Sequence, residues 1–238
     1  TTHTVLHNMV MGVLLIFAIQ WLFLGDLRSA LIVAATIPFA LLFAVTILVV
    51  SGESANLLSM GAIDFGIIVD ATVIMVENIY RHLAEASAGH RHVYTRRTPD
   101  GLTGKLATIY HASSEVTQAI FFSATIIIAG FLPLFTLSGV EGHIFGPMAK
   151  TYAYALSGGL LATFTVSPAL AAVLLPEKVS ETETVIVRAL RRFYRRIVAV
   201  VLAHRVMAVS TGAALFVAAG LAASTVGLEF LPKLEEGN

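Results

Sequence analysis

The sequence contains no cysteine and has few charged residues. The absence of cysteine excludes disulfides, thiolate metal ligands and cysteine nucleophiles. Charged residues make up 13% of the 238 residues and hydrophobic residues 57%, whereas a soluble domain is typically about 25% charged and about 45–50% apolar. Neither sign of charge is in excess, since 15 Lys and Arg balance 15 Asp and Glu, and nothing favours nucleic acid as a partner. We therefore expect an integral membrane protein that has lipid as part of its solvent.

Sequence motifs for enzymatic chemistry are also missing. The chain has no glycine-rich phosphate loop, no nucleophile elbow and no zinc-protease motif. Asp64-Phe65-Gly66 matches the metal-binding triplet of kinases, but it lies in an apolar helix without the other kinase motifs, so we interpret the match as accidental. We expect a protein that is not an enzyme, binds no cofactor and does not take its energy from ATP bound by this segment.

Long apolar runs dominate what is present. We predict six membrane-spanning helices of about 20 residues each, with the prolines at 133 and 168 as kinks. If the loops between the six helices alternate sides, 13 of the 15 Lys and Arg residues lie on one side of the membrane. The positive-inside rule assigns that side to the cytoplasm. Both ends of the chain are then expected in the periplasm. The six runs are residues 9–24, 29–50, 57–80, 116–137, 148–175 and 206–226.

Residues 183–201 have a different pattern. Their arginines follow the spacing i, i+3, i+4, i+7, i+8, with apolar residues on the other side, which predicts a basic amphipathic helix at the membrane surface. A specific site for anionic lipid or for a partner protein is the alternative. The five arginines are Arg188, Arg191, Arg192, Arg195 and Arg196.

The third run carries three acids, Asp64, Asp70 and Glu77. A charge at the centre of a bilayer costs about 2.5–3.5 kcal/mol on insertion scales, so Asp70 needs either protonation or a cationic partner on a neighbouring helix. Seven residues of α-helix separate Asp70 from Glu77, which places them within about 20° of one face and about 10 Å apart, while Asp64 projects about 120° away. This resembles a ladder of carboxyls rather than a metal cage. Glu77 could instead be a solvated helix end and Asp64 could reach the outer interface.

The stretch from Asp64 to Asp70, continued through Glu77-Asn78, closely resembles the fourth transmembrane helix of resistance–nodulation–division (RND) efflux pumps, and of their heavy-metal branch in particular. The drug-exporting branch has two adjacent aspartates where this chain has Asp70-Ala71. The additional Asp64 is similar to pumps for divalent cobalt, zinc and cadmium, whereas copper and silver pumps lack it. Further resemblance extends over nearly the whole chain, at residues 23–33, 138–149, 167–170 and 227–232.

The resemblance implies an all-α membrane protein: a six-helix bundle that is half of an RND transmembrane domain, helices two to seven of twelve. Residues 1–176 would hold helices two to six with a cytoplasmic loop at 81–114. Residues 177–203 would form the amphipathic surface helix, 204–228 helix seven, and 229–238 the start of a second periplasmic segment. Asp64, Asp70 and Glu77 match the family's proton-relay positions.

The resemblance also implies proton-driven efflux of heavy-metal cations across the bacterial inner membrane. The full pump would be a homotrimer joined to a periplasmic adaptor and an outer-membrane channel, with the metal cation and the proton as its substrates. Two alternatives stay open: an RND exporter of drugs or other hydrophobic compounds, and a protein-export component driven by proton-motive force. A metal site at His82, His90 and His92 is disfavoured because arginines surround them.

Overall fold

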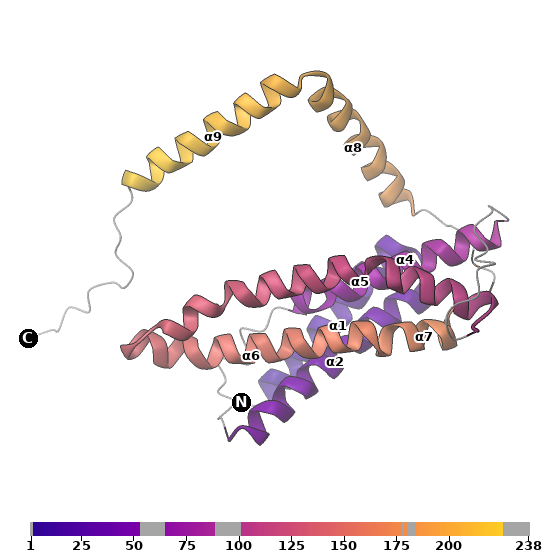
Figure 1. Ribbon diagram of the computed structural model, residues 1–238, viewed down its shortest axis with the longest axis horizontal. Coiled ribbons are helices and arrows are strands. Elements are labelled where there is room, and N and C mark those ends of the chain that lie inside the picture. Colours follow the sequence, from indigo (N-terminus) through magenta and orange to yellow (C-terminus); the bar gives the residue numbers. More distant parts are fainter. Residues whose placement is uncertain (1, 53–64, 89–100, 178, 180–183, 226–238) are drawn as a thin grey trace, which may run out of the picture. The chain divides into compact units, whose positions relative to one another are not determined.

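The computed structural model describes residues 2–52, 65–88, 101–177, 179 and 184–225, and all regular structure in those ranges is helical. The chain divides into two units, residues 1–184 and 185–238, which are described separately. The expectation of an all-helical protein is confirmed within these ranges (Figure 1). The first unit holds α1 (Thr2–Leu24), α2 (Leu27–Val50), α4 (Phe65–Ser87), α5 (Gly104–Gly130), the 3-10 helix η1 (Leu132–Thr136), α6 (Gly139–Phe164) and α7 (Val166–Leu174).

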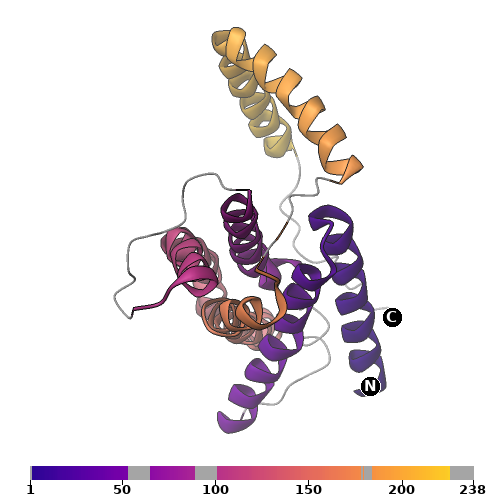
Figure 2. The same ribbon diagram turned by 90° about the vertical axis from the view of Figure 1, so that its right-hand side faces the viewer.

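Helix α4 is central to the first unit. It packs against α1, α2, α5, α6 and α7, and α2 packs in turn against α6 and α7. Figure 2 looks along several of these helices and shows them grouped side by side. The core between α2 and α4 contains Ile37, Met75, Val76 and Ile79, none of which has any exposed surface.

A tight turn joins α1 to α2. Gly25 has a φ of 70°, which glycine adopts without steric cost. Asp26 then caps α2: its Oδ2 accepts hydrogen bonds from the Ser29 backbone N–H at 2.7 Å and from the Ser29 hydroxyl at 2.8 Å. The sequence Gly25-Asp26 therefore fixes both the reversal of the chain and the start of the next helix.

Helix α4 continues past the end of the apolar run 57–80, and helix α5 begins before the apolar run 116–137. The segment 81–114, predicted as a loop, is helical at both ends, because α4 continues to Ser87 and α5 already begins at Gly104; residues 89–100 lie outside the described ranges. Hydropathy marks where a chain leaves lipid, whereas a helix ends where its hydrogen bonds end. Leu83 on α4 and Ala107 and Ala112 on α5 are buried, so packing holds these helix ends together beyond the apolar runs.

The prolines at 133 and 168 lie near helix starts instead of kinking longer helices. Helix α5 ends at Gly130, and Pro133 lies in the first turn of η1. The fifth apolar run is split at Thr165 into α6 and α7, and Pro168 is the third residue of α7. A proline in the first turn removes no intrahelical hydrogen bond. Helix α6 also begins at Gly139, well before the apolar run 148–175 that predicted it.

Four described helical stretches are long and apolar enough to cross a membrane: Leu27–Val50, Gly104–Thr136, Phe145–Leu174 and Arg205–Ala223. Helix α1 contributes a shorter apolar stretch, Val10–Leu24. Helix α4 is less apolar because Asp70, Glu77 and Arg81 all lie within it. The predicted number of six spans stays a prediction.

Several chain segments meet at one end of the bundle in the first unit. The Arg28 guanidinium donates to the Leu174 carbonyl at 3.2 Å, and the Lys105 ammonium donates to the carbonyls of Ala172 and Leu175. The start of α2, the start of α5 and the end of α7 are therefore neighbours. Helix α4 ends at the same place, because the Ser87 hydroxyl accepts from the Val179 N–H at 3.0 Å.

The second unit contains α8 (Val185–Ala203) and α9 (Arg205–Thr225). The helix predicted at 183–201 is present as α8, with all five arginines inside it. No residue of α8 is buried.

Candidate functional site

Helix α4 presents an exposed stripe that carries Asp70 and Glu77. The helix is continuous from 65 to 87, so residues three and four apart stack along one face. Gly66, Asp70, Ile74, Glu77 and Arg81 follow this spacing and are all exposed, whereas the intervening residues face the bundle. The two acids lie on the same face, and Asp64 lies outside the described residues.

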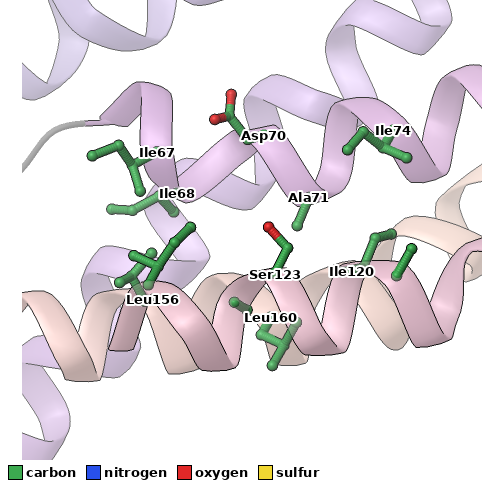
Figure 3. A pocket seen from close by; sticks show the side chains of 12 residues that line it. Ile67, Ile68, Asp70, Ala71, Ile74, Ile120, Ser123, Leu156 and Leu160 are labelled. Atoms are coloured by element: carbon green, nitrogen blue, oxygen red, sulfur yellow. The ribbon is translucent and has the colours of Figure 1, made fainter. Parts of the chain in front are cut away.

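A cavity of about 250 Å³ lies beside Asp70, between α4, α5 and α6. Its lining is apolar except for Asp70 and Ser123. Figure 3 shows the Ser123 hydroxyl directed toward α4 and the Asp70 carboxyl directed away from α5. Asp70 therefore lies at the edge of this cavity, with its carboxyl toward the exposed side of α4. The lining residues are Ile67, Ile68, Asp70, Ala71, Ile74, Ala119, Ile120, Ser123, Ala124, Ile127, Leu156 and Leu160.

The rotation of α4 about its own axis is fixed close to Asp70. Two residues later, the Thr72 and Thr163 hydroxyls share a hydrogen bond of 2.7 Å in the buried contact between α4 and α6, and Thr163 also donates to the Gly159 carbonyl at 2.8 Å. Gly159 lies so close to α4 that a Cβ there would be 2.9 Å from Ile68 Cγ2 and 3.1 Å from the Ile68 carbonyl oxygen. These contacts hold the buried face of α4 inward and thereby keep Asp70 on the outer face.

A polar cluster follows at the end of α4 beyond Glu77. The buried Asn78 amide donates to the Ala112 carbonyl at 2.8 Å and to Glu115 Oε2 at 3.4 Å, and Arg81 donates to Asn78 Oδ1 at 2.9 Å. His82 Nε2 lies 3.1 Å from Glu115 Oε2. Residues placed in a predicted loop therefore belong to the contact between α4 and α5.

Sequence reasoning did not identify Ser123 and Glu115 of α5 as neighbours of the acidic helix, and it placed His82, which lies on α4, in a loop. Their proximity follows from the antiparallel packing of α4 against α5, a tertiary contact that the sequence pattern does not encode. Within the described ranges, no group of three His, Asp or Glu residues is arranged to hold a metal ion. His90 and His92 lie outside those ranges.

The profile of the AcrB/AcrD/AcrF family matches residues 1–238. The cobalt-zinc-cadmium resistance protein CzcA of Cupriavidus metallidurans is 38% identical over 235 residues, which cover 99% of this chain and 22% of CzcA. The cation efflux system protein CusA of Escherichia coli K12 is 37% identical over 221 residues, covering 91% of this chain and 20% of CusA.

A crystal structure of a heavy metal efflux pump, in its second crystal form, superposes on this chain with a TM-score of 0.73 at 33% identity. The matched region covers 99% of this chain and 20% of that structure. The chain thus spans about a fifth of the length of the relatives that it matches.

Proposed function

The chain belongs to the AcrB/AcrD/AcrF family of RND pumps, and from this premise we propose that it is the proton-translocating half-domain of a pump that drives heavy-metal cations out across the bacterial inner membrane. Asp70 is the central proton carrier, Asp64 the outer acid and Glu77 the inner acid. The observation that carries the proposal is Asp70 itself. It is an exposed carboxyl near the middle of the acidic apolar run, where a permanent charge in lipid would cost about 2.5–3.5 kcal/mol.

The exposed stripe of α4 indicates that helices outside residues 1–238 pack against Asp70 and Glu77 in the full pump. Helix α4 buries its remaining surface against five helices of its own unit, yet the face with Asp70 and Glu77 stays uncovered by the described residues. In the full pump, we assign the helices that pack against this face of α4 to the second half of the transmembrane domain. A cationic side chain there could pair with Asp70 whenever its carboxyl is ionised.

The orientation follows from the gathering of Arg28, Lys105 and the end of α4 at one end of the bundle. We assign that end to the cytoplasm because 13 of the 15 Lys and Arg residues fall in the loops on that side if the predicted spans alternate. Both ends of the chain then lie on the periplasmic side. Residues 1–176 form helices two to six, 177–203 the surface helix with its arginines toward the lipid headgroups, 204–228 helix seven, and 229–238 the start of the second periplasmic segment.

The class of metal rests on Asp64 and on Asp70-Ala71. Identity alone does not separate the metals, since CzcA and CusA are 38% and 37% identical to this chain. The pattern of acids favours divalent cobalt, zinc or cadmium. Ala71 argues against a drug exporter, whose central position carries two adjacent aspartates. The complete assembly is a homotrimer that works with a periplasmic adaptor and an outer-membrane channel.

The test uses the full-length pump in a bacterium that lacks its own heavy-metal exporters. Asp70→Asn keeps the size of the side chain but cannot carry a proton, so resistance to zinc, cobalt and cadmium should fall to that of cells without the pump. Glu85→Gln is the matched control, because it makes the same chemical change at an exposed residue of the same helix and should keep full resistance. Wild-type resistance of Asp70→Asn at equal membrane abundance would overturn the assignment.

The substrate class is tested in the same strain. Cells with the unaltered pump should tolerate more zinc, cobalt and cadmium, with no gain against organic dyes. A gain against dyes alone would identify a drug exporter. No gain against any solute would favour the protein-export alternative.

A further inference from the structure

The polar cluster at the inner end of α4 contains a pair, His82 and Glu115, that the proposed relay of Asp64, Asp70 and Glu77 does not use. His82 lies on α4 and Glu115 on α5, 3.1 Å apart between Nε2 and Oε2. The His82 side chain is 11% exposed and the Glu115 side chain 56% exposed. The pair thus joins a largely buried imidazole to a carboxyl that reaches the surface.

The hydrogen bonds of His82 determine where its protons are. Nδ1 lies 2.9 Å from the backbone carbonyl of Asn78, and a carbonyl oxygen only accepts, so Nδ1 must carry a hydrogen. In neutral imidazole Nε2 is then an acceptor, and an ionised Glu115 is also only an acceptor. A hydrogen bond between Nε2 and Oε2 therefore requires one further proton, held as imidazolium with carboxylate or as imidazole with carboxylic acid.

Neighbouring groups hold this geometry in place. The Asn78 amide donates to Glu115 Oε2 as well as to the Ala112 carbonyl, and its own oxygen accepts from Arg81. Glu77 and His82 are five residues apart on α4, which separates them by about 7.5 Å along the helix axis and by about 140° around it. Of the groups that share a hydrogen-bonded proton at this end of α4, the pair is the one that reaches the surface, through Glu115.

We propose that His82 and Glu115 form a proton-holding pair that receives protons after Glu77 and releases them to water on the cytoplasmic side. This rests on the proposed function, since it extends the relay of Asp70 and Glu77 by one step. One proton leaves the Glu77 carboxyl and joins the pair, and the proton already held there leaves through the exposed Glu115 carboxyl. The pair and the Glu77 carboxylate then return to their starting states, and no electron moves.

The helices packed around the pair carry other titratable and charged groups. Arg81 contacts the cluster through Asn78 Oδ1. The remaining titratable groups of these helices are Tyr80 and Glu85 on α4, Lys105, Tyr110 and His111 on α5, Arg28 on α2, His3 and His7 on α1, and Glu141, His143, Lys150, Tyr152 and Tyr154 on α6.

The experiment measures proton influx into proteoliposomes that contain the full-length pump and transport zinc. Glu115→Gln and His82→Gln keep hydrogen-bonding side chains but cannot share the proton, so each should slow proton influx about a hundredfold, a typical contribution of a positioned acid or base. The double variant should be no slower than either single one, because both remove the same shared proton. Zinc binding to the pump should be unchanged in all three.

Two comparisons make the result decisive. Glu85→Gln, one turn further along α4, should keep proton influx within about twofold of the wild type. If Asp70→Asn stops influx while Glu115→Gln and His82→Gln do not, the pair is no part of the path and the proposed function stands. If Asp70→Asn also leaves influx intact, the proposed function itself fails.

A second measurement observes the imidazole directly. In a solid-state NMR spectrum of the full-length pump in lipid, labelled with ¹³C,¹⁵N-histidine, the ring signals of His82 are those that disappear in His82→Gln. The proposal predicts that Nδ1 stays protonated across the pH range while Nε2 alone exchanges its proton with the cytoplasmic side. A spectrum with Nδ1 unprotonated, or with Nε2 closed to exchange, overturns the proposal.

Discussion

Replacing Gly159 by alanine tests whether α6 holds α4 as tightly as the structure indicates. The added Cβ would lie 2.9 Å from Ile68 Cγ2 and 3.1 Å from the Ile68 carbonyl oxygen. A side chain can rotate away, but the carbonyl is part of α4 and moves only if the helix moves. Overpacking of this kind costs about 1–3 kcal/mol. Because Ile68 lies two residues before Asp70, displacement of α4 would also move the candidate relay.

The same substitution at Gly212 is the matched control. Gly212 lies in the interior of α9 and has nothing within 4 Å of the position of its Cβ, so Gly212→Ala gains helix propensity of roughly 1 kcal/mol without a clash. That gain is shared by Gly159→Ala and cancels in the comparison, which leaves the overpacking cost of about 1–3 kcal/mol between the two variants. The corresponding difference in melting temperature is about 2–10 °C.

The assay is thermal unfolding of the two variants in the same detergent, with the wild-type protein as reference. Gly159→Ala should melt below Gly212→Ala by the margin given above. If Gly159→Ala is as stable as Gly212→Ala, the close approach of α6 to α4 is not what fixes the rotation of α4, and the explanation for the outward position of Asp70 is wrong.

Two further predictions concern single hydrogen bonds and use the same assay. Thr72→Val removes the hydrogen bond to Thr163 and should lower the free energy of unfolding by about 0.6–1.7 kcal/mol, the average and the maximum for polar contacts between membrane helices. The double variant with Thr163→Val should lose less stability than the sum of the two single variants. Strict additivity would show that the bond contributes nothing. Asp26→Ala removes the side-chain cap of α2 and should lower the free energy of unfolding by about 0.5–2 kcal/mol. Thr103→Ala should lower it much less, because the Thr103 side chain makes no capping bond to α5. Equal losses in the two variants would contradict the role of Asp26.

The apolar runs predicted the helices better than they predicted helix ends. Lipid burial selects long apolar stretches, which is why α2 and α9 lie within a few residues of the predicted runs. Helix ends depend on backbone hydrogen bonds and on contacts with distant segments. Ser87, for example, bonds the chain after α7, a contact that hydropathy does not encode, so the extension of α4 into the predicted loop could not be inferred.

The candidate site was predictable in part. Helical spacing placed Asp70 and Glu77 on one face, and α4 is a continuous helix through both residues. Nothing in the spacing identified which helix would pack beside that region, or in what register. The neighbours Ser123 and Glu115 depend on the antiparallel pairing of α4 with α5, which is a tertiary contact, and they became visible only in the folded chain.

The most direct test of the central claim is proton entry through the full-length pump in proteoliposomes, compared between the wild type and Asp70→Asn. The account predicts that zinc transport by the wild type is accompanied by proton influx, and that Asp70→Asn binds zinc normally but slows both fluxes at least about a hundredfold. Zinc transport with undiminished proton influx in Asp70→Asn would contradict the assignment of Asp70 as the proton carrier.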